Sequence, residues 1–480
     1  MESPLLPRFA GYIAGQWTTA ASGRTLAVHN PATGELLAEV PDMAEAETQA
    51  AIEAGARAFA QPPPLEQRRE WLRAITALLL EHKEELARII TLEQGKPLAE
   101  SRTEVEYSAG FYRFCAEQIE SIAPKTLAER IRGCEWTVYY RPAGVAGAIT
   151  PWNFPLAMLA KKLSAAIAAG CSVVAKPADL TPLSAIAFWH LAERAGVTPG
   201  ILNLVIGRPA PIGKLLCEHP AVRVLSFTGS TAVGKLLLQQ TAPYVKRLAL
   251  ELGGNAPYIV FEDADIEAAV TALMANKFRC AGQTCVCTNR VYAHEAILPR
   301  FVEAVGARIA ALKVGNGLDE GVEIGPLINR AAFEKVNRHV TDALNRGAQR
   351  VVGQTPEPPR KEWGCFYPPT LLTAMRQEML AFQEETFGPV VSVASFHSED
   401  EVLALANGTP YGLASYLFTR DEARAARCAE RLQFGHVGIN TGTGPTPEAP
   451  FGGMKQSGIG REGGLEGMLE FCEPQAVAKA

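Results

Sequence analysis

Three absences limit what this chain of 480 residues can be. The longest apolar run, 163–175, is shorter than a membrane span and is broken by Gly170. The net charge of −5 is small, so we expect neither nucleic acid nor a membrane as a partner. The first residues lack a basic segment followed by an apolar one, which predicts no secretory signal. Only ten cysteines are present, and their scatter is typical of reduced thiols in a cytoplasmic protein.

The order of apolar and polar residues predicts an α/β protein. Apolar residues make up 48% of the chain and charged residues 20%, which is enough for a sizeable core. The apolar spacing over 66–94 predicts one amphipathic helix. Residues 135–144 predict a lone strand whose partner could come from a neighbouring subunit. From residue 145 strands and helices alternate, which indicates a parallel sheet with crossover helices and a nucleotide-binding architecture.

Two motifs in this alternating region could bind a phosphate or a ribose. In FTGSTAVGK, Gly229 and Ser230 link a strand to a helix start, whose N–H groups and dipole favour an anion. A plain capped helix is an equal alternative, because the glycines do not form GxGxxG. In KPAD, Lys176 ends a strand and could reach a ribose or phosphate. Its alternative is a solvated charge at the end of a strand.

Two further motifs contain candidate catalytic groups. In LELGGNAP, Glu251 lies among apolar residues just before two glycines, where a raised pKa would suit a general base. The alternative is a surface carboxylate at a strand end. In PWNFP, Asn153 lies between two prolines and could donate its amide to an oxyanion. An asparagine before a turn also needs no function.

The stretch FRCAGQTCVCTNR contains three cysteines, Cys280, Cys285 and Cys287. Zinc would need a fourth ligand, and the nearest histidine, His294, follows a predicted strand, so we expect no metal. Buried packing is the alternative for a single cysteine. The neighbouring glycine, glutamine, threonine and asparagine indicate a polar turn instead, and such a loop suits a nucleophile.

The motifs PWNFP, KPAD, FTGSTAVGK, LELGGNAP, FRCAGQTC, EETFGPVV and PFGGMKQSGIGREG occur in this order over three hundred residues. Together they resemble the aldehyde dehydrogenase superfamily along essentially the whole chain. That resemblance implies a Rossmann-type cofactor domain formed by 1–121 and 145–252, and an α/β catalytic domain at 253–440. It also implies a small β bridging segment, formed by 122–144 and 463–480, that pairs the subunits of a homodimer or homotetramer.

The resemblance also implies roles for the catalytic candidates. Cys285 would attack the aldehyde as a thiolate, Asn153 would hold the oxyanion, and Glu251 would activate water to hydrolyse the thioester. The intact set disfavours the alternative of a catalytically silent binding protein on the same fold. Cys287, two residues after Cys285, is a candidate for a reversible disulfide with it. A thiol that only packs is the alternative.

The cofactor expected from the resemblance is NAD, with NADP less favoured. A carboxylate at Asp179 would accept hydrogen bonds from the ribose hydroxyls and repel a 2′-phosphate. The residues expected to contact the cofactor are Trp152, Lys176, Asp179, Gly229, Ser230, Glu385 and Phe387.

The substrate expected from the resemblance is an aldehyde with a carboxylate at its far end. The motifs are most similar to the succinate-semialdehyde dehydrogenase group, whose substrate is gripped by basic residues. The residues expected to bind it here are Arg279, Lys161 and Phe451. Lys161 replaces an arginine of that group, and Pro445 replaces a serine, so α-ketoglutarate semialdehyde or another ω-carboxy semialdehyde is the alternative.

Overall fold

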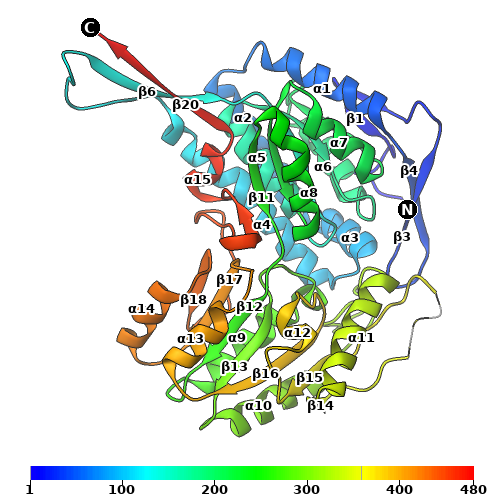
Figure 1. The fold of residues 1–480 in the computed structure, drawn as a ribbon. Helices are drawn as coiled ribbons and strands as arrows, with labels where there is room; N and C mark the ends of the chain where they lie inside the picture. The colour runs from blue at the N-terminus through cyan, green and yellow to red at the C-terminus, as the bar shows by residue number, and fades with distance from the viewer. Residues whose placement is uncertain (1, 358, 360) are drawn as a thin grey trace.

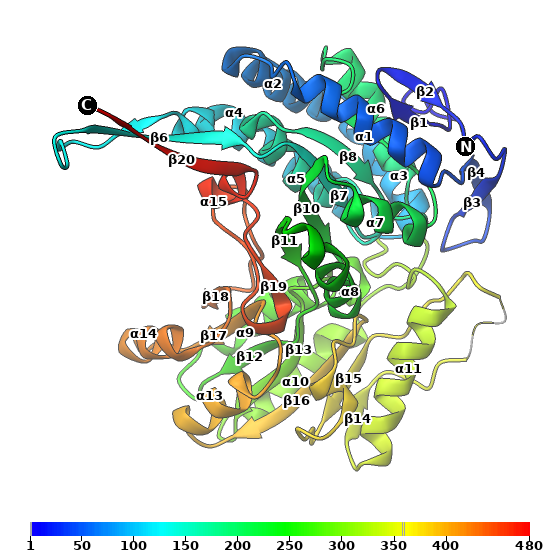
Figure 2. The ribbon, with the colours of Figure 1, turned by 45° about the horizontal axis from the view of Figure 1, so that its top comes forward.

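The structure is a computed structural model that describes residues 2–357, 359 and 361–480. In this described part of the chain the strands form two large sheets, a three-stranded sheet and a two-stranded ribbon. Figures 1 and 2 show the two large sheets in separate halves of the molecule, with the chain crossing between them. The ribbon pairs β3 (Thr25–His29) with β4 (Leu36–Pro41).

The first large sheet has eight strands. In spatial order they are β19 (Gly458–Ile459), β11 (Arg247–Glu251), β10 (Val222–Thr228), β7 (Val145–Ile149), β8 (Ser172–Lys176), β9 (Leu202–Leu204), β1 (Gly11–Ile13) and β2 (Gln16–Thr18). The strands from β11 to β9 are parallel, and the others are antiparallel edges. From β7 the chain builds outward to β8 and β9, then returns to the other side for β10 and β11. In an open parallel sheet, a ligand site is expected where the order reverses, here beyond the carboxyl ends of β7 and β10.

Helices cover both faces of this sheet. The connecting helices are α5 (Ala157–Ala169), α6 (Leu183–Arg194), α7 (Pro209–Glu218) and α8 (Thr231–Thr241), the last followed by η2 (Ala242–Tyr244). Ala146 and Ala148 of β7 pack in the same core as α5 and α6, whereas Val145 and Ile149 pack with α1 (Glu45–Phe59) and α7. Alternate residues of a strand point to opposite faces, so β7 is buried on both. This explains why its sequence is continuously apolar.

The single helix predicted over 66–94 is wrong. The structure has two helices, α2 (Leu65–Glu81) and α3 (Lys83–Gln94), which meet at His82. His82 has φ −98° and ψ 21°; its N–H closes α2 on Leu78, and its carbonyl accepts from Leu86 in the first turn of α3. The predicted apolar stripe nevertheless packs into one core with α4 (Leu98–Gln118) and η1 (Ile119–Ile122). The break therefore changes the direction of the chain without exposing the stripe.

The second large sheet has seven strands and confirms the alternation predicted for the second half. In spatial order they are β14 (Gln349–Val352), β15 (Thr370–Thr373), β16 (Val390–Phe396), β13 (Thr288–His294), β12 (Ala256–Val260), β17 (Ala414–Phe418) and β18 (His436–Ile439). All neighbours are parallel except β14 and β15. Its helices are α9 (Ile266–Lys277), η3 (Arg279–Gly282), α10 (Leu298–Ala310), α11 (Arg330–Asn345), α12 (Leu380–Gln383), α13 (Glu399–Asn407) and α14 (Glu422–Arg431).

The strand predicted at 135–144 is present as β6 (Glu135–Pro142), and its partner lies in the same chain. It pairs antiparallel with β20 (Cys472–Lys479) from Glu135 opposite Lys479 to Pro142 opposite Cys472, and with β5 (Lys125–Thr126) on its other edge. The C-terminal strand follows η4 (Lys455–Ser457) and α15 (Gly464–Leu469). In both views β6 and β20 extend away from the body of the molecule (Figures 1 and 2). The neighbouring subunit suggested as a partner for this strand is thus not needed.

No helix in the described residues combines the length and apolar character needed to cross a bilayer. The chain passes from the first sheet to the second through 252–255, between the carboxyl end of β11 and the amino end of β12. The carboxyl ends of the first sheet therefore face the loops of the second.

Candidate active site

Two cavities lie between the sheets, and they meet at Cys285. The first has a volume of about 230 Å³ and the second about 400 Å³. Asn153, Met158 and Cys285 line both. Asn153 and Cys285 were candidates from the sequence. The Cys285 thiol lies where molecules bound in the two cavities could meet.

The loop that carries Cys285 is held by an unusual backbone. Cys280, Ala281 and Gly282 have φ values of 53°, 53° and 74°, so three consecutive residues are left-handed. At Gly282 a Cβ atom would lie 2.2 Å from the carbonyl oxygen of Gly388, which leaves no room for a side chain. The turn predicted from the polar residues is present, because the N–H of Cys287 donates to the carbonyl of Thr284 at 3.2 Å.

Burial keeps the Cys285 thiol protonated. Desolvation raises its pKa to about 12, against the opposing effect of the Lys161 ammonium. The carboxylates of Glu385 and Glu251 act in the same direction as burial. A thiolate at this position therefore needs a base to take its proton or a further positive charge nearby.

The second cavity lies where the strand order of the first sheet reverses. Five residues expected to contact a cofactor line it: Trp152, Gly229, Ser230, Glu385 and Phe387. Ser230 caps α8 by accepting from the Val233 N–H at 3.3 Å, so the N-terminus of α8 opens onto this cavity.

The shape and charge of this cavity fit a nicotinamide dinucleotide. A Cβ atom at Gly229 would lie 2.4 Å from the Phe227 ring, so the backbone there stays bare for close approach. The helix N-terminus suits a phosphate, and the Glu385 carboxylate suits ribose hydroxyls. Burial raises the pKa of Glu385 to about 7, and its Oε1 accepts from the Gly254 N–H at 3.2 Å.

Lys176 and Asp179 do not line this cavity as the structure has it. Lys176 ends β8 and is buried; burial lowers its pKa, against the opposing charge of Asp179. Asp179 is partly exposed three residues further on. The two side chains lie close enough to interact with each other beside the cofactor cavity.

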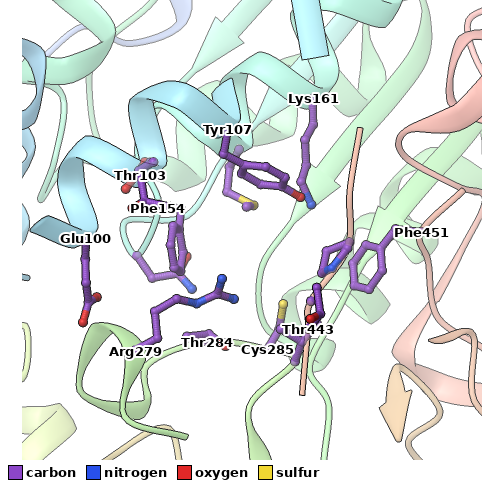
Figure 3. A pocket seen from close by; sticks show the side chains of 16 residues that line it. Glu100, Thr103, Tyr107, Phe154, Lys161, Arg279, Thr284, Cys285, Thr443 and Phe451 are labelled. Carbon is purple, nitrogen blue, oxygen red and sulfur yellow. The ribbon is translucent and has the colours of Figure 1, made fainter. Parts of the chain in front are cut away.

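All three residues expected to bind substrate line the first cavity. Figure 3 shows the Arg279 guanidinium entering it from the lower left and the Lys161 ammonium from above beside Phe451, with the Cys285 sulfur below the ammonium. The Arg279 guanidinium carbon lies 5.3 Å from the centre of the Phe154 ring, and its Nε finds no hydrogen-bond acceptor among the described residues. Lys161 is already paired, 3.6 Å from Oε2 of Glu462.

Glu251 ends β11 and is buried, but it lines neither cavity. Neither carboxylate oxygen has a hydrogen-bond partner within the described residues. Burial raises its pKa well above the usual value, and the nearby Glu462 carboxylate raises it further. The raised pKa expected from the sequence is therefore present, with a second carboxylate as an added cause.

Asn153 is held on both its backbone and its side chain. Its Nδ2 donates to the Gln283 carbonyl at 2.8 Å, and its own carbonyl accepts from Lys96 Nζ at 2.6 Å. Because an amide nitrogen carries two N–H bonds, one remains for a substrate oxygen.

Cys287 differs from Cys285 in its surroundings. It is fully buried, and its thiol donates to the Gly282 carbonyl at 3.2 Å, with Lys277 Nζ at 3.6 Å. All three cysteines of the loop are free thiols. The disulfide with Cys285 stays a prediction. In the part of the chain that is described, no three histidine, cysteine or acidic side chains are grouped as metal ligands would be.

Sequence reasoning missed a buried ion pair that supports the asparagine loop. Lys96 Nζ lies 2.6 Å from Glu104 Oε2 and 3.6 Å from the centre of the Phe154 ring. Glu104 Oε1 accepts from the N–H groups of Leu156 and Ala157 at the start of α5. Other charged residues lie within a few positions of both in the sequence, so their pattern does not distinguish them.

It also missed Glu462 and Lys162, which contact each other beside Glu251. Glu462 lies in PFGGMKQSGIGREG, and a carboxylate among so many glycines was a signal that could have been used.

Comparisons with known proteins agree with this geometry. The aldehyde dehydrogenase family matches residues 17–477. A 3-sulfolactaldehyde dehydrogenase of Pseudomonas putida is 46% identical, over 99% of this chain and 98% of its own length. A succinate-semialdehyde dehydrogenase of Escherichia coli K12, named as NADP(+)-dependent, is 46% identical over 96% of this chain and 95% of its own.

Solved structures agree as well. The crystal structure of a succinate-semialdehyde dehydrogenase from Burkholderia pseudomallei is 48% identical, with a TM-score of 0.97 over 100% of this chain and 99% of that one. The chain therefore belongs to the aldehyde dehydrogenase family. It is an NAD(P)-dependent, non-phosphorylating aldehyde dehydrogenase, which confirms the predicted fold and enzyme class.

The Lys96–Glu104 pair predicts an unequal result for two lysine variants. Lys96→Met leaves Glu104 buried without its cation and should destabilise the protein by roughly 3–5 kcal/mol. Its matched control is Lys83→Met, which breaks a solvent-accessible pair between the first residue of α3 and Glu106 of α4 and should cost about 1 kcal/mol or less. Thermal unfolding of both variants measures the difference. Equal losses would show that the buried pair is not what supports the loop.

Proposed function

We propose that this enzyme oxidises an aldehyde whose far end carries a carboxylate, with succinate semialdehyde the first candidate. The main evidence is the position of Cys285, which lies where two cavities meet. The first cavity is also lined by the Arg279 guanidinium, which has no salt bridge among the described residues. α-Ketoglutarate semialdehyde is the second candidate. Relatives named for succinate semialdehyde and 3-sulfolactaldehyde both act on aldehydes with an anionic group, which supports this substrate class.

In the proposed mechanism Cys285 Sγ passes its proton to solvent water and forms a bond to the aldehyde carbon. The oxygen of the resulting thiohemiacetal accepts hydrogen bonds from Asn153 Nδ2 and from the backbone N–H of Cys285. A bound nicotinamide would supply the hydride acceptor, and loss of the hydride from the thiohemiacetal carbon would leave Cys285 as a thioester. Glu251 then takes a proton from water, whose oxygen attacks the thioester and releases the acid and the thiol.

The proposed cofactor residues surround the second cavity. The N-terminus of α8, with Gly229 and Ser230, would hold phosphate, while Glu385 would hold a ribose. Trp152 and Phe387, whose rings lie 5.7 Å apart at 89°, would bound the nicotinamide. Lys176 and Asp179 would contact the adenosine ribose just outside the cavity.

We expect Arg279 and Lys161 to contribute unequally to binding the substrate carboxylate. Arg279 is the main cation for the substrate carboxylate, because its Nε has no acceptor in the described residues and Glu100, a carboxylate lining the same cavity, acts on it without a salt bridge. Lys161 lies deeper and shares Glu462 with Lys162, so its contribution to the grip is smaller. Phe451 would pack against the carbon chain of the substrate, between its aldehyde and its carboxylate.

The proposed assembly is a homodimer or homotetramer. The sheet of β5, β6 and β20 extends from the body and exposes Leu127, Ile131 and Val477 by 39–47%. Apolar residues on a projecting sheet favour a subunit contact. Segments 122–144 and 463–480 would then bridge subunits, as the domain assignment from the sequence predicts.

The mechanism predicts different failures for two variants. Cys285→Ala should abolish turnover, because no other group can make the covalent intermediate. Glu251→Gln should still give one burst of reduced cofactor and then stall at the thioester. Rapid mixing followed at 340 nm (roughly the absorbance band of reduced nicotinamide) separates the two. A Glu251→Gln enzyme with the wild-type steady-state rate would remove Glu251 from the mechanism.

The substrate proposal predicts a selective loss in Arg279→Ala. A charged hydrogen bond is worth about 1.5–3 kcal/mol, so kcat/KM on succinate semialdehyde should fall roughly ten- to hundredfold. Butanal, of similar length, should be affected much less. The matched control is Arg308→Ala, an exposed arginine of α10 that lines the neighbouring cavity but not the first. An equal loss on both aldehydes would assign Arg279 a structural role in the loop.

The cofactor proposal predicts a preference for NAD over NADP. Asp179 would accept from the ribose hydroxyls and repel a 2′-phosphate, so Asp179→Ser should raise kcat/KM with NADP relative to NAD. Steady-state assays with both cofactors in both proteins provide the comparison. A wild-type enzyme that prefers NADP, as the name of the Escherichia coli relative specifies for that protein, would overturn it.

A further inference from the structure

Four ionisable side chains from three separate parts of the chain form a buried cluster. In it Glu251 Oε1 lies 2.8 Å from where a Cβ atom of Gly452 would be, next to the Phe451 that pairs with Glu462. Lys161 and Lys162 come from α5, Glu251 ends β11, and Glu462 lies between β19 and α15. Glu462 is held in place by its backbone, which exchanges two hydrogen bonds of 2.7 Å with Phe451. Its carboxylate is shared: Oε1 contacts Lys162, and Oε2 lies 3.6 Å from Lys161 Nζ.

The two lysines have different surroundings. Lys162 is fully committed, because its Nζ contacts Glu462 and lies 2.7 Å from Thr228 Oγ1. Lys161 faces Glu462 on one side and the first cavity on the other, where Figure 3 shows its ammonium beside the Tyr107 hydroxyl and near Phe451. Its Nζ lies 4.8 Å from the centre of the Phe451 ring and 5.7 Å from that of Phe111.

The charges of these four groups balance only when Glu251 is ionised, and Arg461, a further cation that acts on Glu251, has the Glu470 carboxylate beside it. The two lysines carry two positive charges, and Glu462 carries one negative charge. When Glu251 is protonated, one positive charge has no partner in the cluster. When Glu251 is ionised, the cluster is neutral. A medium of low polarity penalises net charge strongly, so the extra cation favours the ionised carboxylate.

We propose that Lys161 is the counter-ion of Glu251, the positive charge that lets this buried carboxylate act as a base. This inference rests on the proposed role of Glu251 in hydrolysing the thioester. It gives Lys161 a task on every substrate, charged or not, in addition to its smaller part in gripping a carboxylate.

The charged groups around both residues support this assignment. Burial and Glu462 raise the pKa of Glu251, whereas Lys161, Lys162 and Arg461 lower it. Among these cations, Lys162 is held by Glu462 and Thr228, and Arg461 donates to the carbonyls of Gly453 and Gly460.

Lys161 itself stays charged despite its burial. Burial alone would lower its pKa, but Tyr107, Glu462, Cys285 and Glu251 raise it above the usual value. The Lys161 ammonium is also the strongest group opposing burial at the Cys285 thiol. A test must therefore separate attack by Cys285 from hydrolysis assisted by Glu251. The acyl-enzyme separates them, because its cysteine is bonded to the acyl group and no longer titrates.

The test uses propanal, which has no carboxylate for Lys161 to grip. The acyl-enzyme is formed by rapid mixing, and its hydrolysis is followed after a jump to each pH. A carboxyl acts as a base only after it loses its proton, so a raised pKa moves the rising limb of the profile to higher pH. Lys161→Met should move this limb upward by about one unit or more, and Lys161→Arg should restore it.

Glu462→Gln gives an independent check of opposite sign. Removing the neighbouring anion lowers the pKa of Glu251, so the limb should move to lower pH. This variant also keeps the inference testable if Lys161→Met does not fold. If Lys161→Met leaves the pH profile of hydrolysis unchanged and raises only the KM for succinate semialdehyde, the inference is overturned, and Lys161 serves only to bind the substrate carboxylate. If Lys161→Met does not fold, the inference is overturned when the rising limb of the Glu462→Gln profile stays in place or moves to higher pH.

The two proposals fail differently. If Glu251→Gln hydrolyses the acyl-enzyme as the wild type does, the proposed base is wrong, and the inference falls with it. If Glu251→Gln stalls while the limb of Lys161→Met stays in place, only the counter-ion role is wrong.

Discussion

The site depends on a buried salt bridge between Lys96 and Glu104, because it ties the helical first part of the chain to the loop after β7. One partner holds the carbonyl of Asn153, and the other caps α5. The same region holds the cysteine loop, since Glu100 accepts from the N–H of Cys280 at 2.7 Å. A rigid pair of charges inside the protein thus sets the distance between the asparagine and the cysteine, which come from different sheets.

A second constraint is the scarcity of water around the reacting groups. The Glu251 carboxylate is buried, the Cys285 thiol and the Glu385 carboxylate are only partly exposed, and desolvation raises the pKa of all three. The cations close to them act against that tendency. The chemistry of the site is therefore a balance between desolvation and a few fixed positive charges, and small changes in either move it.

Much of this could be predicted from the sequence, because short motifs with rigid geometry carry it. PWNFP, the glycine turn at Gly229 and the polar loop around Cys285 lie where a strand or helix ends, and the structure brings all three to one place. The alternation of strands and helices predicted the sheets for the same reason.

The rest depended on contacts between distant residues. The break at His82 leaves the apolar stripe on the core, so periodicity alone could not reveal it. The partner of β6 lies more than 300 residues away along the chain. Lys96 and Lys162 look like ordinary surface charges until the fold encloses them.

The pairing of β6 with β20 has a consequence for how the protein is made. Met468, Phe471 and Cys472 belong to the same core as the helices of the first 121 residues, and β19 forms an edge of the first sheet. During synthesis, the core and the sheet of that half cannot close until residues 458–472 have left the ribosome. The nascent chain therefore carries an open sheet edge and an uncovered apolar surface until these residues have been made.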